Sequence, residues 1–166
     1  MNSDSPENPL QDIKKEYKNV EKIAKITVFV PKQNVSEMAK ELQISWMNPR
    51  ITDQAYPTKD SFVGEWEIEV LRPKNTLKFD EIVRLCKEDG YSPATIFHLL
   101  SFVSTAKNTI QYKSLLAPAS LCIDDFEYVG CVALGVEKED LKLGLGNWRG
   151  SKIGGYDILR VKKMSA

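Results

Sequence analysis

Residues 34–43 have the spacing of apolar positions that is typical of a helix. In "NVSEMAKELQ" the apolar side chains recur every three or four residues, which is typical of one face of an amphipathic helix. The face comprises Val35, Met38, Ala39 and Leu42. Asn34 opens this stretch and Glu37 follows three residues later, which is the capping-box pattern. A helix is therefore predicted directly after Asn34.

Two segments, one before this helix and one after it, have the pattern of strands. "KIAKITVFV" is rich in β-branched residues and stops at Pro31. "FVGEWEIEVLRP" places Trp66, Ile68 and Val70 at every second position, with a glutamate at each position between them. That alternation predicts a half-buried strand with an acidic outer face. Residues 45–61, between the strands, contain prolines, aspartates and an asparagine and predict a long loop.

Residues 81–104 are expected to form a helical hairpin. "FDEIVRLCKEDG" has helical spacing and ends at Gly90, a residue common just after a helix. "SPATIFHLLSFVS" begins with Ser92 as the expected cap and Pro93 beside it. The two helices would meet at a short corner and pack on a sheet.

The last third of the chain changes to strand-like runs separated by acidic or glycine-rich turns. The runs are "ASLCIDD", "EYVGCVALG", "DLKLGLG" and "YDILRVKK". Their close spacing favours an antiparallel meander over residues 109–166. The expected fold class is therefore α+β, with early β-α elements, a helical hairpin and a C-terminal antiparallel sheet.

The domain organisation predicted from these patterns is simple. Residues 1–8 are a polar, disordered tail, and residues 9–22 form an amphipathic helix that begins with proline. Residues 23–166 make one α+β domain, which is an ordinary size for a single core.

Composition narrows the function classes. Lysine plus arginine number 23 and aspartate plus glutamate number 23, so the zero net charge disfavours nucleic acid as partner. No apolar run reaches the length of a membrane helix and no signal-peptide pattern is present, so a cytoplasmic protein without membrane contact is expected. Three cysteines without CxxC spacing favour neither disulfides nor zinc.

Signals for catalysis are weak. The chain has one histidine, His98, which lies between apolar residues in "IFHLLSF", and it lacks HExxH, GxSxG and P-loop patterns. "GLGNWRGSKIGGY" has arginine at the third glycine position of a dinucleotide loop and is followed by a strand rather than a helix. No cofactor, metal or catalytic residue is predicted, and an enzyme of unknown class ranks third among the functions.

The favoured function is a non-enzymatic interaction module, with a protein as the expected partner. Tryptophan and arginine are enriched at binding hot spots. The candidate surface joins the 45–61 loop to a hairpin at 147–156 through Trp46, Arg50, Trp148, Arg149 and Lys152.

The second hypothesis is a DNA- or RNA-binding regulator. "EIVRLCKEDGYSPATIFHLL" resembles the helix-turn-helix of the lactose-repressor family, with Cys86, Gly90, Ile96 and Leu99 on the matching buried positions. The resemblance implies base contacts from the second helix, and the candidate residues are Ser92, Thr95 and His98. The sequence departs from that family at Asp89, where the family has an apolar residue, and at Phe97 and His98, where it has polar ones.

A longer resemblance covers residues 79–163. "GYSPATIFHLLSF" and "YDILRVKK" are similar to "G-Y-R-P-A-T-x-x-E-L-L-A-F" and "R-F-L-A-V-R-K" in a family of small bacterial proteins found in candidate-phylum genomes. The chain has Ser92 where that family has arginine and His98 where it has glutamate. The ending also resembles the last strand of C-type-lectin-like domains. These resemblances imply an architecture and no activity.

Overall fold

The computed structural model describes residues 20–106, 114–123, 129–137, 140–147 and 153–164. These residues build a mixed sheet of eight strands in the order β1-β3-β8-β5-β6-β7-β2, with β4 paired to β8. The strands are β1 (Val20–Val30), β2 (Trp46–Met47), β3 (Gly64–Pro73), β4 (Ser92–Pro93), β5 (Ser114–Ile123), β6 (Val129–Glu137), β7 (Asp140–Asn147) and β8 (Tyr156–Lys163). The β5–β8 and β2–β7 pairs are parallel, and the other pairs are antiparallel.

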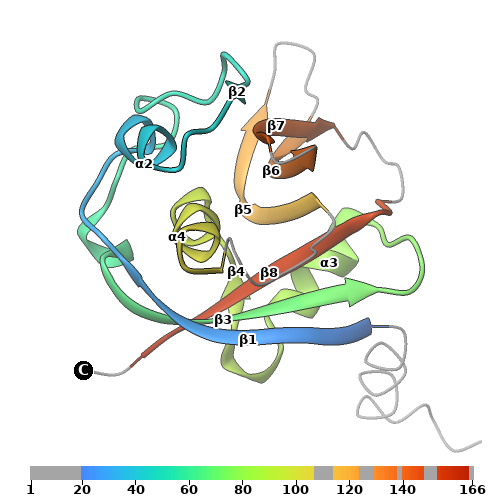
Figure 1. Cartoon of the computed structure of the whole chain (residues 1–166). Helices are drawn as coiled ribbons and strands as arrows, with labels where there is room; N and C mark the ends of the chain where they lie inside the picture. Colours follow the sequence, from blue (N-terminus) through green and yellow to red (C-terminus); the bar gives the residue numbers. More distant parts are fainter. Residues whose placement is uncertain (1–19, 107–113, 124–128, 138–139, 148–152, 165–166) are drawn as a thin grey trace, which may run out of the picture.

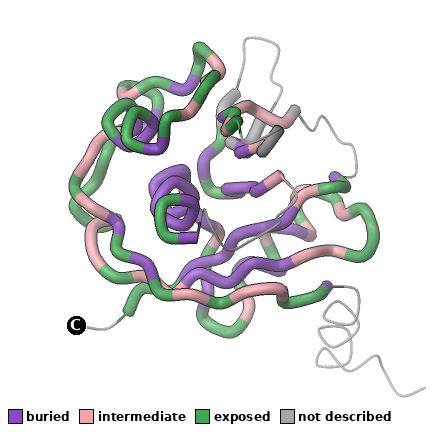
Figure 2. The backbone as a smooth tube through the Cα atoms, in the orientation of Figure 1, coloured by how far each residue is buried: buried purple, intermediate pink, exposed green. Residues whose placement is uncertain are grey.

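The sheet curls around helix α4 (Ile96–Ala106), as Figure 1 shows, while α2 (Val35–Glu41) and β2 lie near the far end of the curl. The inner face forms the larger core, because alternate residues such as Val70, Leu115 and Leu159 point towards α4. Leu99 and Leu100 of α4 are fully buried there. Figure 2 shows this helix and the strands beside it as mostly buried.

The outer face of the same strands has a second, smaller core. The intervening residues Leu71, Leu116 and Ile158 point away from α4 and pack beneath α3 (Phe79–Cys86). Ile82 and Leu85 provide the apolar side of α3. The middle of the sheet is therefore covered on both faces, a condition in which strands need apolar residues on both sides.

The predicted capping box at the start of α2 is confirmed. The backbone N–H of Glu37 donates to the Asn34 side-chain oxygen over 2.8 Å, and the Asn34 N–H donates to the Glu37 carboxylate over 3.4 Å. Two N–H groups at the helix terminus that have no partner within the helix are satisfied in this way.

The expected α+β class with a helical hairpin is wrong, because the described residues form a sheet-dominated fold with three short helices. After α3 the chain makes a 3₁₀ turn, η2 (Glu88–Gly90), and then enters the sheet as β4. The N–H of Ala94 donates to the Leu159 carbonyl, and the N–H of Ala119 donates to the Ala94 carbonyl. Sheet hydrogen bonds on both sides of Ala94 thus replace the corner that the sequence predicted.

Ser92 consequently does not cap α4. The N–H of Ile96, at the start of the helix, instead donates over 2.7 Å to the hydroxyl of Ser120 on β5. A cap from a distant strand leaves no local sequence signal. The helix-turn-helix geometry, which needs a turn of three or four residues, is absent from residues 79–106.

The C-terminal third follows the predicted meander through β5, β6 and β7 and then departs from it. β8 does not pair with β7; it lies between β3 and β5. Met164, which directly follows β8, donates its N–H to the Glu65 carbonyl. The last strand of the chain therefore joins the two halves of the sheet.

The N-terminal predictions fall mainly outside the described residues. The tail expected at 1–8 and most of the helix expected at 9–22 lie there. The last three residues of that expected helix, 20–22, belong to β1.

Candidate binding groove

The outer face of the sheet differs from the packed middle where it reaches β5, β6 and β7. Strand register aligns Trp46 with Lys142, Lys142 with Gly135, and Ser114 with Tyr156. Gly135 completes the row, since a Cβ built on it would lie 3.7 Å from the Ser114 hydroxyl. One row across five strands thus has an aromatic residue at each end and small or flexible side chains between them.

The next row on this face has even less side-chain volume at its β7 end. Gly144 pairs with Ala133, which pairs with Leu116. Neither Gly135 nor Gly144 has a positive φ, so backbone conformation does not demand glycine at these positions. A Cβ at either position would make ordinary van der Waals contacts. Glycine inside a strand weakens the strand and often marks a place where another molecule approaches the backbone closely.

Gly135, Ala133 and Gly144 form a part of the sheet with little side-chain volume, here called the bare strip. Trp46, on the short edge strand β2, borders it. Its side chain is 48% exposed, although large hydrophobic residues are usually covered. One edge of its ring lies 3.8 Å from the position that a Gly144 Cβ would occupy. Together these residues border a hollow of about 190 Å³, here called the Trp46 pocket. Its lining comprises Trp46, Ser114, Ala133, Gly135, Lys142, Gly144, Leu145, Gly146 and Tyr156.

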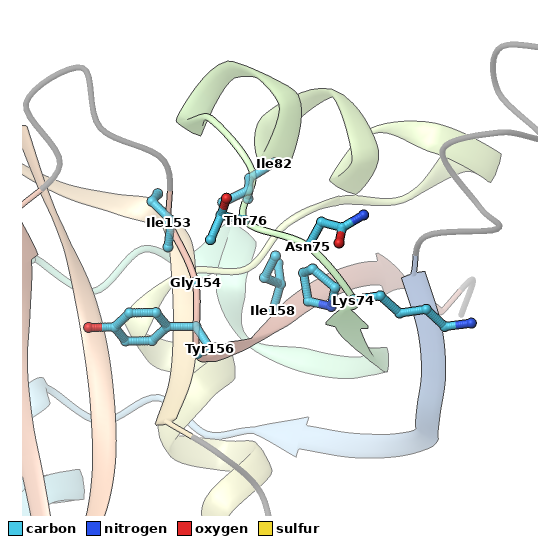
Figure 3. Close-up of a pocket in the computed structure, with 10 residues that line it drawn as sticks. Lys74, Asn75, Thr76, Ile82, Ile153, Gly154, Tyr156 and Ile158 are labelled. Atoms are coloured by element: carbon cyan, nitrogen blue, oxygen red, sulfur yellow. The ribbon is translucent and has the colours of Figure 1, made fainter.

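A second hollow of about 140 Å³, here called the Thr76 pocket, begins at Tyr156 and extends towards α3. Figure 3 shows Ile82, Ile153 and Ile158 around it, with Thr76 and Asn75 from the segment after β3. The lining also contains Pro73, Lys74, Gly154, Gly155 and Tyr156. Because Tyr156 lines both hollows, they are adjacent, and the two together are here called the outer groove.

The wall between Thr76 and Gly154 is tight. The backbones of Leu77 and Ile153 exchange two hydrogen bonds. A Cβ added to Gly154 would lie 2.7 Å from the Thr76 methyl group, which is closer than carbon atoms approach without displacement. Here glycine is required by packing, in contrast to Gly144.

Positive charge is present along the outer groove. Lys142 lines the Trp46 pocket and Lys74 lines the Thr76 pocket, while the described residues that line either pocket include no aspartate or glutamate. The whole chain has no net charge, so this sign is a local property of the groove.

Among the described residues of the surface predicted from sequence, Trp46 lines the Trp46 pocket. Tyr156, which lies in the 147–156 segment but is not one of the predicted residues, lines the same pocket. Arg50 is exposed on the loop but does not line either pocket. Trp148, Arg149 and Lys152 lie outside the described residues.

Sequence reasoning missed the middle of the site, namely Lys142, Gly135, Gly144 and Ser114. A signal was present in "DLKLGLG", where leucines alternate with lysine and glycine. The leucines point into the core, as Leu143 does at 0% exposure. The alternate positions must therefore form the opposite face of the strand, which has charged side chains at Asp140 and Lys142 and none at Gly144 and Gly146.

The residues predicted to contact DNA or RNA lie outside this groove. Ser92 is exposed on β4, whereas His98 is 2% exposed inside the inner core. The Nδ1 atom of His98 accepts a hydrogen bond of 3.0 Å from the Thr95 N–H, and the Thr95 hydroxyl lies 2.9 Å from the same atom. Burial lowers the pKa of His98 to about 3. A side chain in this position cannot contact a base edge while α4 remains packed.

His98 also has no carboxylate partner among the described hydrogen bonds. Its ring lies at 4.3 Å from the Trp66 ring, edge to face, and its Nε2 has no hydrogen-bond partner. These contacts describe a packed histidine with an indole neighbour, an arrangement that the aromatic quadrupole favours.

A buried polar network occupies the outer face of β3 and β8. Arg160 is 0% exposed and binds the carboxylate of Glu69 through Nε, at 3.0 Å, and through Nη2. Its guanidinium lies 4.3 Å from the Tyr91 ring centroid, and the Tyr91 hydroxyl donates to Glu67 over 2.6 Å. Burial, together with the bond to Glu67, raises the pKa of Tyr91. The acidic outer face predicted for β3 is therefore wrong at Glu69, which is 3% exposed.

Comparison with known proteins does not assign this chain to a family. No protein family, curated protein or solved structure matches this chain. The described residues contain no group of three or more His, Cys, Asp or Glu side chains arranged to hold a metal ion. None of the described helices is both long enough and apolar enough to cross a bilayer.

Proposed function

We propose that this protein is a non-enzymatic binding module and that its ligand occupies the outer groove. The observation that carries the proposal is the half-exposed Trp46 beside Gly144, on a part of the sheet where glycine and alanine leave the backbone accessible. An exposed indole next to accessible backbone provides a large flat contact area with little side-chain entropy to lose.

The residue types that line the groove support binding rather than catalysis. Its lining contributes lysine, serine, threonine, asparagine and tyrosine groups but, among the described residues, no histidine, cysteine or carboxylate. A serine or threonine hydroxyl is a weak nucleophile unless an adjacent general base activates it, and histidine or a carboxylate often fills that role. We also propose a cytoplasmic location, supported by Cys86, which is a free thiol in the outer core.

The proposal is tested with ligand-observed NMR on a panel of adenosine, methyl glucoside, N-acetyl-tyrosinamide and a short mixed-sequence peptide. The wild-type protein and the variants Trp46→Ala and Phe29→Ala are compared. Phe29 is a matched control because it is an aromatic residue on a strand, 60% exposed, and does not line the groove.

For at least one probe, we expect a saturation-transfer signal with the wild type and with Phe29→Ala. With Trp46→Ala that signal should be mostly lost. If no probe signal depends on Trp46, the outer groove is not a binding site and the proposal is wrong. Thermal unfolding of each variant confirms that the substituted proteins are folded.

A further inference from the structure

The length, charge and flat surfaces of the outer groove indicate a ligand class. This step rests on the proposed function, since it assigns a ligand to the same groove. Trp46 and Tyr156 stand at the two ends of a row that crosses five strands. Four spacings of about 4.8 Å give roughly 19 Å between their backbones along the sheet. The Thr76 pocket extends the groove beyond Tyr156. A single small molecule is too short to contact the whole length, whereas a chain fits it.

The charge of the lining selects an anionic chain. Lys142 stands between the two aromatic residues in the row, and Lys74 lines the pocket on the far side of Tyr156. Asp140 lies two residues from Lys142 on the same face of β7, but neither it nor any other described carboxylate lines the two pockets. Two positive side chains spaced along such a lining complement repeated negative charge.

The face of the sheet and its two aromatic rings favour a nucleic-acid strand over an acidic peptide as the ligand. The groove crosses the face of the sheet, where the backbone N–H and C=O groups are already paired between strands. A peptide therefore cannot add to it as a strand. Rings placed beside accessible backbone suit bases, because every base has a face that stacks on an aromatic side chain.

We propose that the outer groove binds single-stranded nucleic acid, with bases stacked on Trp46 and Tyr156 and phosphates close to Lys142 and Lys74. Bases in a duplex are covered by their neighbours, so unpaired strands are favoured. Weak, salt-dependent binding without strict sequence preference is expected.

The test is fluorescence anisotropy with 5′-labelled ten-nucleotide U₁₀ and dT₁₀ at low salt, with an abasic ten-mer of equal charge and an acidic tyrosine-containing peptide as comparison probes. Full-length wild-type protein is compared with Trp46→Ala, Phe29→Ala, Lys142→Gln and Lys40→Gln. Lys40 is the matched control for Lys142, since it is exposed on α2 and outside both pockets.

Trp46→Ala is expected to lower affinity for U₁₀ or dT₁₀ about 5- to 100-fold, as loss of one stacking platform does. Phe29→Ala and Lys40→Gln should bind like the wild type. Lys142→Gln should reduce the slope of log affinity against log salt by about 0.7, which corresponds to one phosphate contact on a single strand. The abasic probe should bind more weakly than either base-containing strand.

Three results would overturn the assignment. These are no binding of either strand at low salt, equal binding of the abasic probe, and equal binding by Trp46→Ala. If the peptide alone binds in a Trp46-dependent way, the ligand class is wrong while the binding groove stands. Gly144→Val provides a second variant that fills the strip with a strand-favouring residue and should also abolish binding.

Discussion

The two halves of this sheet use their outer faces differently. On β3 and β8 that face is filled, first by the apolar contacts of α3 and then by the buried Arg160–Glu69 pair beneath Tyr91. On β6 and β7 the equivalent face has glycine at positions 135 and 144 and an exposed indole at its border. The inner face is apolar in both halves. The outer face is therefore closed by packed side chains in one half, whereas in the other half glycines leave it open beside Trp46.

Breaking the buried pair should have the largest effect on stability. Arg160→Met leaves Glu69 buried without its guanidinium, and loss of one partner from such a pair typically costs about 3–5 kcal/mol. Replacing both residues, with Arg160→Met and Glu69→Leu together, removes the buried charge and should recover a large part of that loss. Urea unfolding of the single and double variants measures both effects. A loss below about 1 kcal/mol for Arg160→Met would show that the filled half does not depend on this pair.

The two kinds of glycine in the groove offer a second test. Gly154→Ala places a methyl group 2.7 Å from the Thr76 methyl and should destabilise the protein by about 1–3 kcal/mol, as overpacking does. Thr76→Ser removes that methyl, so the double variant should regain most of the stability. Thermal unfolding of the four proteins gives the coupling between the two sites. No coupling would mean that the wall of the Thr76 pocket moves easily.

The filled half also has a buried titratable group on its inner side. The folded-state pKa of His98 is about 3, below the value of about 6.5 expected in the unfolded chain. The unfolded state therefore binds more protons below pH 6.5, and the stability present above that pH is lost as pH falls towards 3. Near pH 5 the loss should be about 2 kcal/mol, since each pH unit contributes up to about 1.4 kcal/mol.

Unfolding in urea at pH 7, 6 and 5 measures this dependence. His98→Asn, whose amide oxygen can accept the hydrogen bond from Thr95, is the matched control without a titrating ring. The variant should be less sensitive to pH over this range. Parallel curves for the two proteins would assign the pH dependence to other groups.

Local patterns predicted much of the secondary structure and little of its assembly. The capping box at Asn34 lies within four residues of sequence and was confirmed. The strand predicted at "YDILRVKK" is β8, but its place between β3 and β5 depends on pairs such as Ile68 with Val161. Partners more than 90 residues apart leave no mark on local periodicity. The same reason explains Glu69, which alternation placed outside and which Arg160 holds inside.

The prediction of a helical hairpin was wrong for a related reason. "SPAT" has a strong local preference to begin a helix, yet Ser92 and Pro93 pair with β8 and a serine of β5 caps α4. The candidate site was predicted only at Trp46, because an exposed aromatic residue in a loop is visible in the sequence. The middle of the site could be identified only from the strand register, which places Gly135 and Gly144 on one face.

The smallest predicted effect separates a structural glycine from one that leaves space for a ligand. Gly144→Ala adds a methyl group in ordinary contact with Trp46, at 3.8 Å, and it needs no change of backbone. Alanine in a strand is favoured over glycine by about 0.5–1 kcal/mol. The variant should therefore be slightly more stable than the wild type while it binds ligand more weakly. Calorimetric unfolding and the anisotropy assay together decide the point. Destabilisation would show that the bare strip serves the packing of Trp46, and the contrast between the two halves of the sheet would then carry no functional meaning.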